Sequence, residues 1–350
     1  MATKFNVSAL TLNPQEATEV SQAVVEQVFV MSELADNHEV MTGIQMKEQI
    51  VFVGQLGIGG EALVNCTPAE QDALAFTQKY WDPALIAGRF TNCQNDLNKL
   101  FKLFKKAQKA NPDYFDKDGS EEMAMLSVAI TESIKTSVNA KVWYSDTAGA
   151  LFSGGGNFTN GTNLGLFNQF DGLFKQIFAD GTVPRYTIAE NAGATYTAQT
   201  LSAGKSYTIL KSLYNLADAR LLGHEDAKIY VTRSIYDNYL DYLETTEAVG
   251  GNIQVLENGR KLLTYRGITV ALQNEWDRLQ NAYQNNGTVV FRPHRALMTV
   301  PANIPVGTLS EDDLENLESW YEKKDKSNIV DFAYFLDAKH LVSYMTTVAY

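Results

Sequence analysis

The feature that most constrains this sequence is a long apolar pattern at helical spacing between residues 120 and 144. Six apolar side chains recur there every three or four positions, at Met123, Leu126, Ile130, Ile134, Val138 and Val142. This spacing places them on one face of a single helix, which Asp118 or Ser120 can cap at its N-terminus. Because each buried apolar side chain contributes roughly 1.5–3 kcal/mol, we expect this helix to form the spine of the core.

Composition restricts the class of protein. The 350 residues are 45% hydrophobic and 20% charged, enough for one large or two ordinary domains. A net charge of −12 argues against a primary nucleic-acid binder, which needs clustered Lys and Arg. The two cysteines, Cys66 and Cys93, favour a reducing cytosol. No apolar run reaches membrane-spanning length and the N-terminus has no signal core, so we expect no membrane association.

One stretch is locally basic, with lysines at Lys99, Lys102, Lys105, Lys106 and Lys109. It fits the solvated face of an amphipathic helix over 94–109, with Leu100, Leu103 and Phe104 turned inward. A local phosphate-binding patch is the other interpretation. Lysine contacts phosphate without reading bases, so we expect at most non-specific, salt-sensitive contact with DNA.

The N-terminal part of the chain lacks the pattern of a compact domain. Residues 1–12 are polar and predict an arm, and Asn13-Pro14 then starts a helix. Residues 46–93 contain two β-prone segments, one that ends at Val53 and a returning strand over 76–90, with a glycine-rich run, 54–60, between them. They predict a long protruding hairpin. The run lacks the G-x-G-x-x-G spacing of a phosphate cradle, so we interpret it as a flexible turn.

The rest of the chain alternates helical and strand patterns, which predicts an α+β fold. We expect helices at 167–178, 206–222 and 235–243. We expect strands at 227–232, 289–291 and 296–300, and a strand pair over 262–272 around the turn Arg266-Gly267. Residues 186–202 fit either strand or loop, and the closing segment 331–344 alternates like a strand.

Three segments imitate binding motifs without meeting their requirements. Gly204-Lys205-Ser206 lacks the first glycine of a phosphate-binding loop, because position 199 is Gln. Residues 116–122 fail as a calcium loop, since Tyr114 and Met125 would occupy ligand positions. The His224-Glu225-Asp226 triplet has a single histidine in an expected loop, so we interpret it as solvated and not metal-binding.

Catalytic motifs are also missing. The four histidines, His38, His224, His294 and His340, lie in unrelated segments, and no H-E-x-x-H, G-x-S-x-G or C-x-x-C occurs. A Cys–His pair formed by Cys66 or Cys93 with His294 stays open. We predict no catalytic, cofactor-binding or metal-binding residues, no cofactor and no enzyme activity. A cytosolic enzyme without a recognisable motif is the alternative from another functional class.

The order of elements resembles the major capsid protein of tailed bacteriophages, whose Hong Kong 97-type capsid fold encapsulins share. In that family an N-terminal arm and an extended loop precede a spine helix, and a peripheral domain frames an axial domain. The resemblance is carried by 168–177, 206–222 with 227–232, 264–270, 296–308, 320–326 and the closing strand. In character the sequence is similar to capsid proteins of phages that infect Bacteroidetes.

The resemblance implies a division of the chain into four parts. Residues 1–45 would form the N-terminal arm and 46–93 the extended loop. The peripheral domain would consist of 94–160 and 286–350, with the spine helix at about 120–144. Residues 161–285 would form the axial domain.

The resemblance also implies a function. It implies a structural protein that self-assembles as pentamers and hexamers into an icosahedral shell around phage DNA, located in the virion after assembly in the host cytoplasm. Only an arm and a loop precede the spine helix, which implies a separate scaffolding protein, with portal and decoration proteins as further partners. An encapsulin-type nanocompartment shell is the alternative within the same fold.

Overall fold

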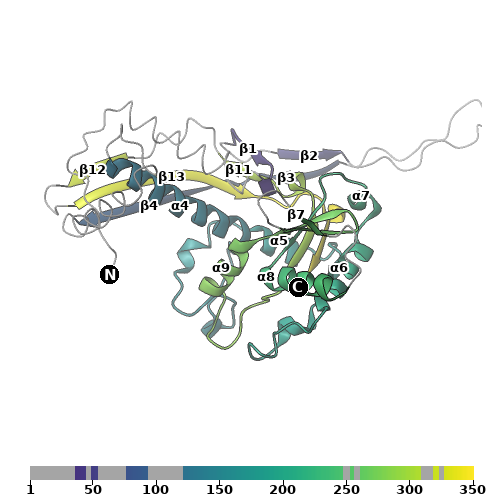
Figure 1. Cartoon of the computed structure of the whole chain (residues 1–350). Coiled ribbons are helices and arrows are strands. Elements are labelled where there is room, and N and C mark those ends of the chain that lie inside the picture. Colours follow the sequence, from purple (N-terminus) through teal and green to yellow (C-terminus); the bar gives the residue numbers. More distant parts are fainter. Residues whose placement is uncertain are drawn as a thin grey trace, which may run out of the picture.

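The computed structural model of the chain describes residues 36–44, 49–53, 76–93, 121–246, 253–255, 261–308, 318–322 and 327–350. The described helices and strands form an α+β fold with two main sheets and one separate hairpin (Figure 1). The predicted arm 1–12, the glycine run 54–60 and the lysine-rich helix 94–109 lie outside the described residues, as does most of the calcium-like segment 116–122.

The predicted spine is present as α4, Glu121–Tyr144. The described part of its apolar face is buried at Ile134, Val138 and Val142, as their spacing predicted. In Figure 1, α4 runs alongside the long strands β4 and β13, and together they project away from the body of the molecule.

A narrow five-stranded sheet accompanies this helix, with β4 pairing β13 outside the path β1-β11-β13-β12. The strands are β1 (Val40–Met41), β4 (Ala84–Cys93), β11 (Val306–Thr308), β12 (Glu318–Glu322) and β13 (Ser327–Ala338). The β4–β13 ladder is antiparallel and runs from Cys93 opposite Ser327 to Ala84 opposite Leu336. The sheet therefore joins segments that lie far apart in the sequence.

The predicted hairpin is partly described. Strands β2 (Gln49–Val53) and β3 (Phe76–Tyr80) pair antiparallel, with Gln49 opposite Tyr80. The expected return strand over 76–90 is wrong as one element, because β3 ends at Tyr80 and β4 starts at Ala84. Pro83 has no N–H for a ladder, and the N–H of Asp82 donates to the Asp337 carboxylate at 2.7 Å. β4 then pairs with β13 and not with β2.

A seven-stranded sheet of order β5-β14-β10-β6-β9-β8-β7 forms the body. Its strands are β5 (Arg185–Tyr186), β6 (Lys228–Val231), β7 (Ile253–Val255), β8 (Lys261–Tyr265), β9 (Ile268–Leu272), β10 (Ala296–Thr299) and β14 (Thr346–Ala349). Strand β10 lies between β6 and β14. The sheet therefore crosses the expected boundary between residues 285 and 286. Both residues of the β8–β9 turn have positive φ, 50° at Arg266 and 85° at Gly267, as the predicted tight turn requires.

Helices cover this sheet. They are α5 (Leu173–Ala179), α6 (Lys205–Leu216), α7 (Ala219–Leu222), α8 (Arg233–Thr245) and α9 (Asn274–Tyr283). Short 3₁₀ turns occupy Phe152–Gly154, Leu164–Leu166, Ala189–Ala192, Pro301–Asn303 and Ser343–Met345. The middle strands alternate between two hydrophobic clusters. Tyr230 and Leu297 belong to the cluster with α4, α5 and α9, whereas Ile229 and Met298 belong to the cluster with α6 and α8.

Three further expectations need correction. The helix expected over 206–222 breaks after Leu216, because the Asp218 side chain accepts the N–H of Arg220 and caps α7 separately. The helix expected over 167–178 begins only at Leu173, where α5 starts next to the end of α4. A Cβ on Gly172 would lie 2.9 Å from the backbone N of Ser145, so this approach needs glycine.

The third correction concerns the strand expected over 289–291, where only a single bridge joins Asn285 to Val290. The N–H of Val290 donates instead to the Gln199 side chain at 3.1 Å, and the N–H of Phe291 donates to the Gln284 carbonyl. Both donors are therefore engaged away from any strand ladder. Helix α9, just before this segment, was not predicted.

Candidate functional site

The histidines do not gather into one site, and three of them are buried in separate places. His38 Nδ1 lies 2.8 Å from the carbonyl oxygen of Ile304, and His340 Nε2 lies 3.0 Å from Thr346 Oγ1. His294 contacts a serine hydroxyl and a backbone carbonyl. Burial lowers the pKa of His38 and of His340 to about 4, so both are neutral at pH 7. Each imidazole serves as a local hydrogen-bonding group of the fold.

The fourth histidine lies at the surface. His224 Nδ1 is 4.0 Å from the nearer carboxylate oxygen of Asp226, and both side chains are exposed. Among the described residues, no group of three or more His, Cys, Asp or Glu side chains could hold a metal ion. Cys66 and the side chain of Cys93 lie outside the described residues, so the Cys–His pair stays a hypothesis.

The phosphate-loop look-alike is engaged within the fold. Gly204 has φ 73° and precedes α6. Lys205 Nζ lies 2.9 Å from Glu190 Oε1, and the backbone N–H of Ser206 donates to Asn238 Oδ1 at 3.0 Å. A phosphate would have to compete with the carboxylate and the amide for both donors. The motif therefore connects the start of α6 to α8 and to the segment that precedes α6.

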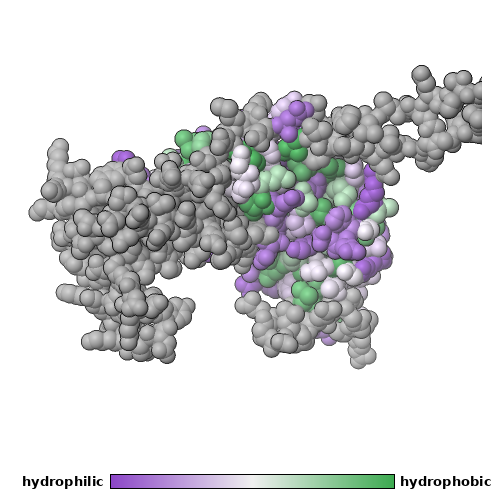
Figure 2. All heavy atoms as spheres, turned by 90° about the horizontal axis from the view of Figure 1, so that it is seen from above, coloured by the Kyte–Doolittle hydropathy of each residue, from purple (hydrophilic) through white to green (hydrophobic). Residues whose placement is uncertain are grey.

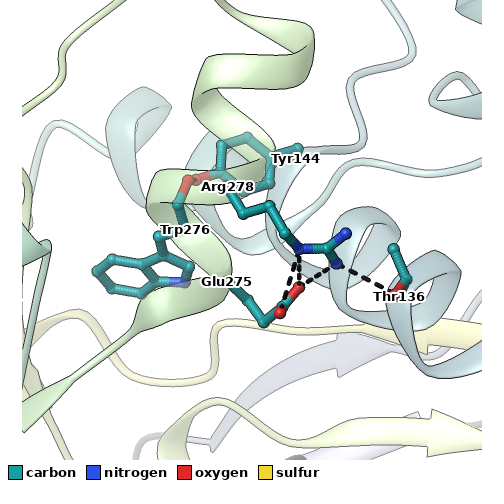
Figure 3. A network of polar contacts seen from close by, with 5 residues as sticks. All are labelled: Thr136, Tyr144, Glu275, Trp276 and Arg278. Carbon is teal, nitrogen blue, oxygen red and sulfur yellow. Dashed lines mark hydrogen bonds and ion pairs between the residues drawn. The ribbon is translucent and has the colours of Figure 1, made fainter. Parts of the chain in front are cut away.

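A buried aromatic junction forms where α4 ends against α5 and α9. The ring centroids of Trp143 and Trp276 lie 4.7 Å apart and those of Phe174 and Trp276 4.9 Å apart, both edge to face. Figure 3 shows two polar links between α4 and α9: the hydroxyl of Tyr144 donates to the Trp276 carbonyl at 3.1 Å, and Arg278 donates to a threonine of α4 while pairing with a glutamate of its own helix. These contacts hold the end of the spine helix against the body.

A second polar site lies where the hairpin meets the body. Lys79 Nζ donates to the backbone carbonyl of His340, and the fully buried carboxylate of Asp337 accepts from Lys339 Nζ at 2.9 Å and from the N–H of Asp82. Burial raises the pKa of Asp337 and lowers that of Lys79. These contacts attach β3 and the start of β4 to the end of β13.

Large apolar side chains are exposed at Tyr80, Leu85, Leu166, Tyr196, Leu216 and Tyr344. Tyr80 and Leu85, 46% and 58% exposed, flank the short connection between β3 and β4. From above, Figure 2 shows the described surface as a mixture of hydrophilic and hydrophobic patches. No described helix combines the length and the apolar character needed to cross a membrane.

Sequence reasoning missed several of these residues. Helix α9 carries a usable signal, because Trp276, Leu279 and Tyr283 recur at helical spacing. The buried charges of Arg295 and Asp337 carry no local signal, since charged side chains are ordinarily exposed.

Comparisons with known proteins add the fold. No protein-family profile and no curated protein sequence matches this chain. A chain of the satellite phage P4 procapsid that includes the size determination protein matches with a TM-score of 0.53 at 10% identity, over 94% of this chain and 98% of that chain. A chain of Gordonia phage Cozz matches with a TM-score of 0.51 at 10% identity, over 91% of this chain and 85% of that chain. The expectation for the fold is confirmed: this chain has the Hong Kong 97-type capsid fold.

Proposed function

We propose that this chain is a structural major capsid protein that assembles as pentamers and hexamers into an icosahedral shell around phage DNA. The observation that carries the proposal is the extent of the fold match, which includes 94% of this chain and 98% of a procapsid chain. The subunit fold is thus matched over nearly the whole chain, whereas the three buried histidines and the phosphate-loop look-alike are engaged in internal contacts.

The shape of the subunit supports assembly. Helix α4 and the strands β4 and β13 extend away from the body as a narrow strip (Figure 1). Exposed sheet edges present unpaired backbone groups, and exposed apolar side chains such as Leu85 gain from being covered. A narrow strip of this form offers its surface to neighbouring subunits, whose contacts would stabilise it.

The proposal includes the domain division and the partners. The strip with the five-stranded sheet corresponds to the peripheral domain, 94–160 and 286–350, joined by β4 from the extended loop 46–93. Strands β10 and β14 of the seven-stranded sheet fall within 286–350. The other strands of that sheet, with α6 and α8, correspond to the axial domain, 161–285, and residues 1–45 correspond to the arm. A scaffolding protein, a portal and decoration proteins are the expected partners. DNA contact is non-specific, assembly takes place in the host cytoplasm, and the subunit has no enzyme activity.

A phage shell is favoured over an encapsulin-type compartment, because the two solved structures compared above come from phages. Origin in a phage of Bacteroidetes stays a prediction.

Electron microscopy and light scattering of the purified full-length protein test the assembly. We expect closed shells or capsomers for the natural protein. Leu85→Glu should impair assembly, since a charge would be buried at a contact, while leaving the unassembled subunit stable within about 0.5 kcal/mol, because the side chain is already exposed. Leu85→Met is the matched control and should assemble normally.

A protein that stays monomeric over a wide concentration range, with and without a scaffolding partner, would contradict the proposal. Normal assembly of Leu85→Glu would remove this surface from the interface but leave the shell function standing.

A further inference from the structure

A cavity of about 270 Å³ lies beside the junction, between the end of α4, helix α5 and the segment 284–295. Its walls combine the aromatic rings of Phe174 and Phe178 with three cationic side chains, Lys175, Arg292 and Arg295, and with one acidic residue, Asp146. At roughly 30 Å³ per water, this volume corresponds to about nine water molecules. The cavity is therefore large enough for a small polar group.

Arg295 is the most unusual of these cations, because its residue is only 1% exposed. Its guanidinium donates to Gln284 Oε1 at 2.6 Å and to the backbone carbonyls of Phe291 and Arg292, each at 3.0 Å. All of these acceptors are neutral. Among the residues that the structure describes, no carboxylate forms an ion pair with Arg295.

Arg292 adds a second guanidinium. It lies over the rings of Tyr350 and Phe178, at 4.1 and 4.9 Å from their centroids, and it too has no described carboxylate partner. Burial, and to a lesser degree the nearby charge of Arg292, lowers the pKa of Arg295 to about 10. Lys175 differs, because its Nζ lies 2.9 Å from Asp146 Oδ1.

Two buried or half-buried cations without a counter-ion are unfavourable, since burying a charge costs free energy unless it is paired. A planar guanidinium presents paired N–H donors that match the oxygens of a carboxylate or a phosphate group. Aromatic walls lower the local dielectric constant and so strengthen attraction for an anion.

We propose that this cavity binds an oxyanion, a carboxylate or phosphate group, between the guanidinium groups of Arg292 and Arg295. The group can come from a free anion or from an acidic side chain of a second copy, since the chain has 41 acidic against 29 basic residues. The inference concerns the single subunit and does not depend on the proposed shell function.

Thermal melting of the full-length unassembled subunit tests the site, with inorganic phosphate as the probe against sodium chloride at equal ionic strength. At phosphate tenfold above the dissociation constant, we expect the Tm to rise by about 2 °C. Arg292→Gln should abolish this rise, and Arg295→Lys should reduce it. Arg266→Gln is the matched control, because Arg266 also lies over an aromatic ring, 4.6 Å from the Tyr214 centroid, but does not line the cavity.

Light scattering of the same proteins distinguishes the two sources of the oxyanion, a free anion and an acidic side chain of a second copy. If a side chain of a second copy supplies the oxyanion, phosphate and Arg292→Gln will both weaken self-association, and Arg266→Gln will not. If a free anion is the ligand, self-association will be unchanged while the Tm still rises. Equal Tm values in phosphate and chloride, or a full rise in Arg292→Gln, overturn the proposal.

Discussion

Lowering the pH from 7.5 to 5 should destabilise this protein through two buried histidines, His38 and His340. Burial holds the pKa of each at about 4 in the folded protein, against 6.5 in the unfolded chain. Between these values the unfolded chain binds a proton that the folded protein excludes. The free energy of unfolding is therefore highest, with respect to these two groups, above pH 6.5, and it decreases as the pH falls toward 4.

The size of the loss follows from the pKa difference. At pH 5, which is 1.5 pH units below the usual pKa of 6.5, the imidazole in the unfolded chain is almost fully protonated. The imidazole in the folded protein is still mostly neutral. At about 1.36 kcal/mol per pH unit, each histidine lowers the free energy of unfolding by about 2 kcal/mol, and the pair lowers it by about 4 kcal/mol. His294 adds to the loss, because burial lowers its pKa too. Asp277 and Asp337 oppose it, because burial raises their pKa values and protonation then favours the folded state.

Urea unfolding of the full-length protein at both pH values measures this loss. His38→Gln keeps a donor for the Ile304 carbonyl but cannot be protonated, so its loss should be smaller than that of the natural protein by about 2 kcal/mol. Each variant is compared with itself at the two pH values, so any packing defect cancels. His224→Gln, at the surface, is the control. An unchanged pH dependence in His38→Gln would refute the reasoning.

Three further predictions concern stability, each measured by urea unfolding at pH 7.5. Trp276→Ala should lower the free energy of unfolding by about 3–5 kcal/mol, because it empties the centre of the junction. Trp276→Phe should lower it by less, since the buried indole Nε1 has no described hydrogen-bond partner that would be lost. Gly307→Ala should cost about 1–3 kcal/mol, because the new Cβ would lie 2.7 Å from Ile44 Cδ1. Asp337→Asn should cost about 3 kcal/mol, because it leaves Lys339 without its buried partner.

Local patterns in the sequence predicted local structure well. The spacing of Ile134, Val138 and Val142 located α4, and Arg266-Gly267 located the β8–β9 turn, because helical periodicity and turn chemistry act over a few residues. The break between α6 and α7 was missed, because Asp218 can serve either inside a helix or as a cap.

Long-range pairing was beyond local patterns. β4 pairs with β13, which joins Cys93 to Ser327 across most of the chain, and no periodicity within either segment specifies its partner. Arg295 shows the same limit for the candidate oxyanion site. Its burial depends on Phe174 of α5 and Tyr144 of α4, so the sequence around Arg295 resembles that of any exposed arginine.

Part of the acid-sensitive stability lies where extended segments of the chain attach to the body. His38 belongs to the segment 36–44 and its ring lies 5.1 Å from that of Trp143 on the spine helix. The backbone carbonyl of His340 accepts from Lys79 at the base of the hairpin. Charging either imidazole thus disfavours the contacts that hold an extended segment on the body. Hydrogen exchange at pH 5 should therefore rise in 36–44 and 76–80 before it rises in the central strands β6 and β9.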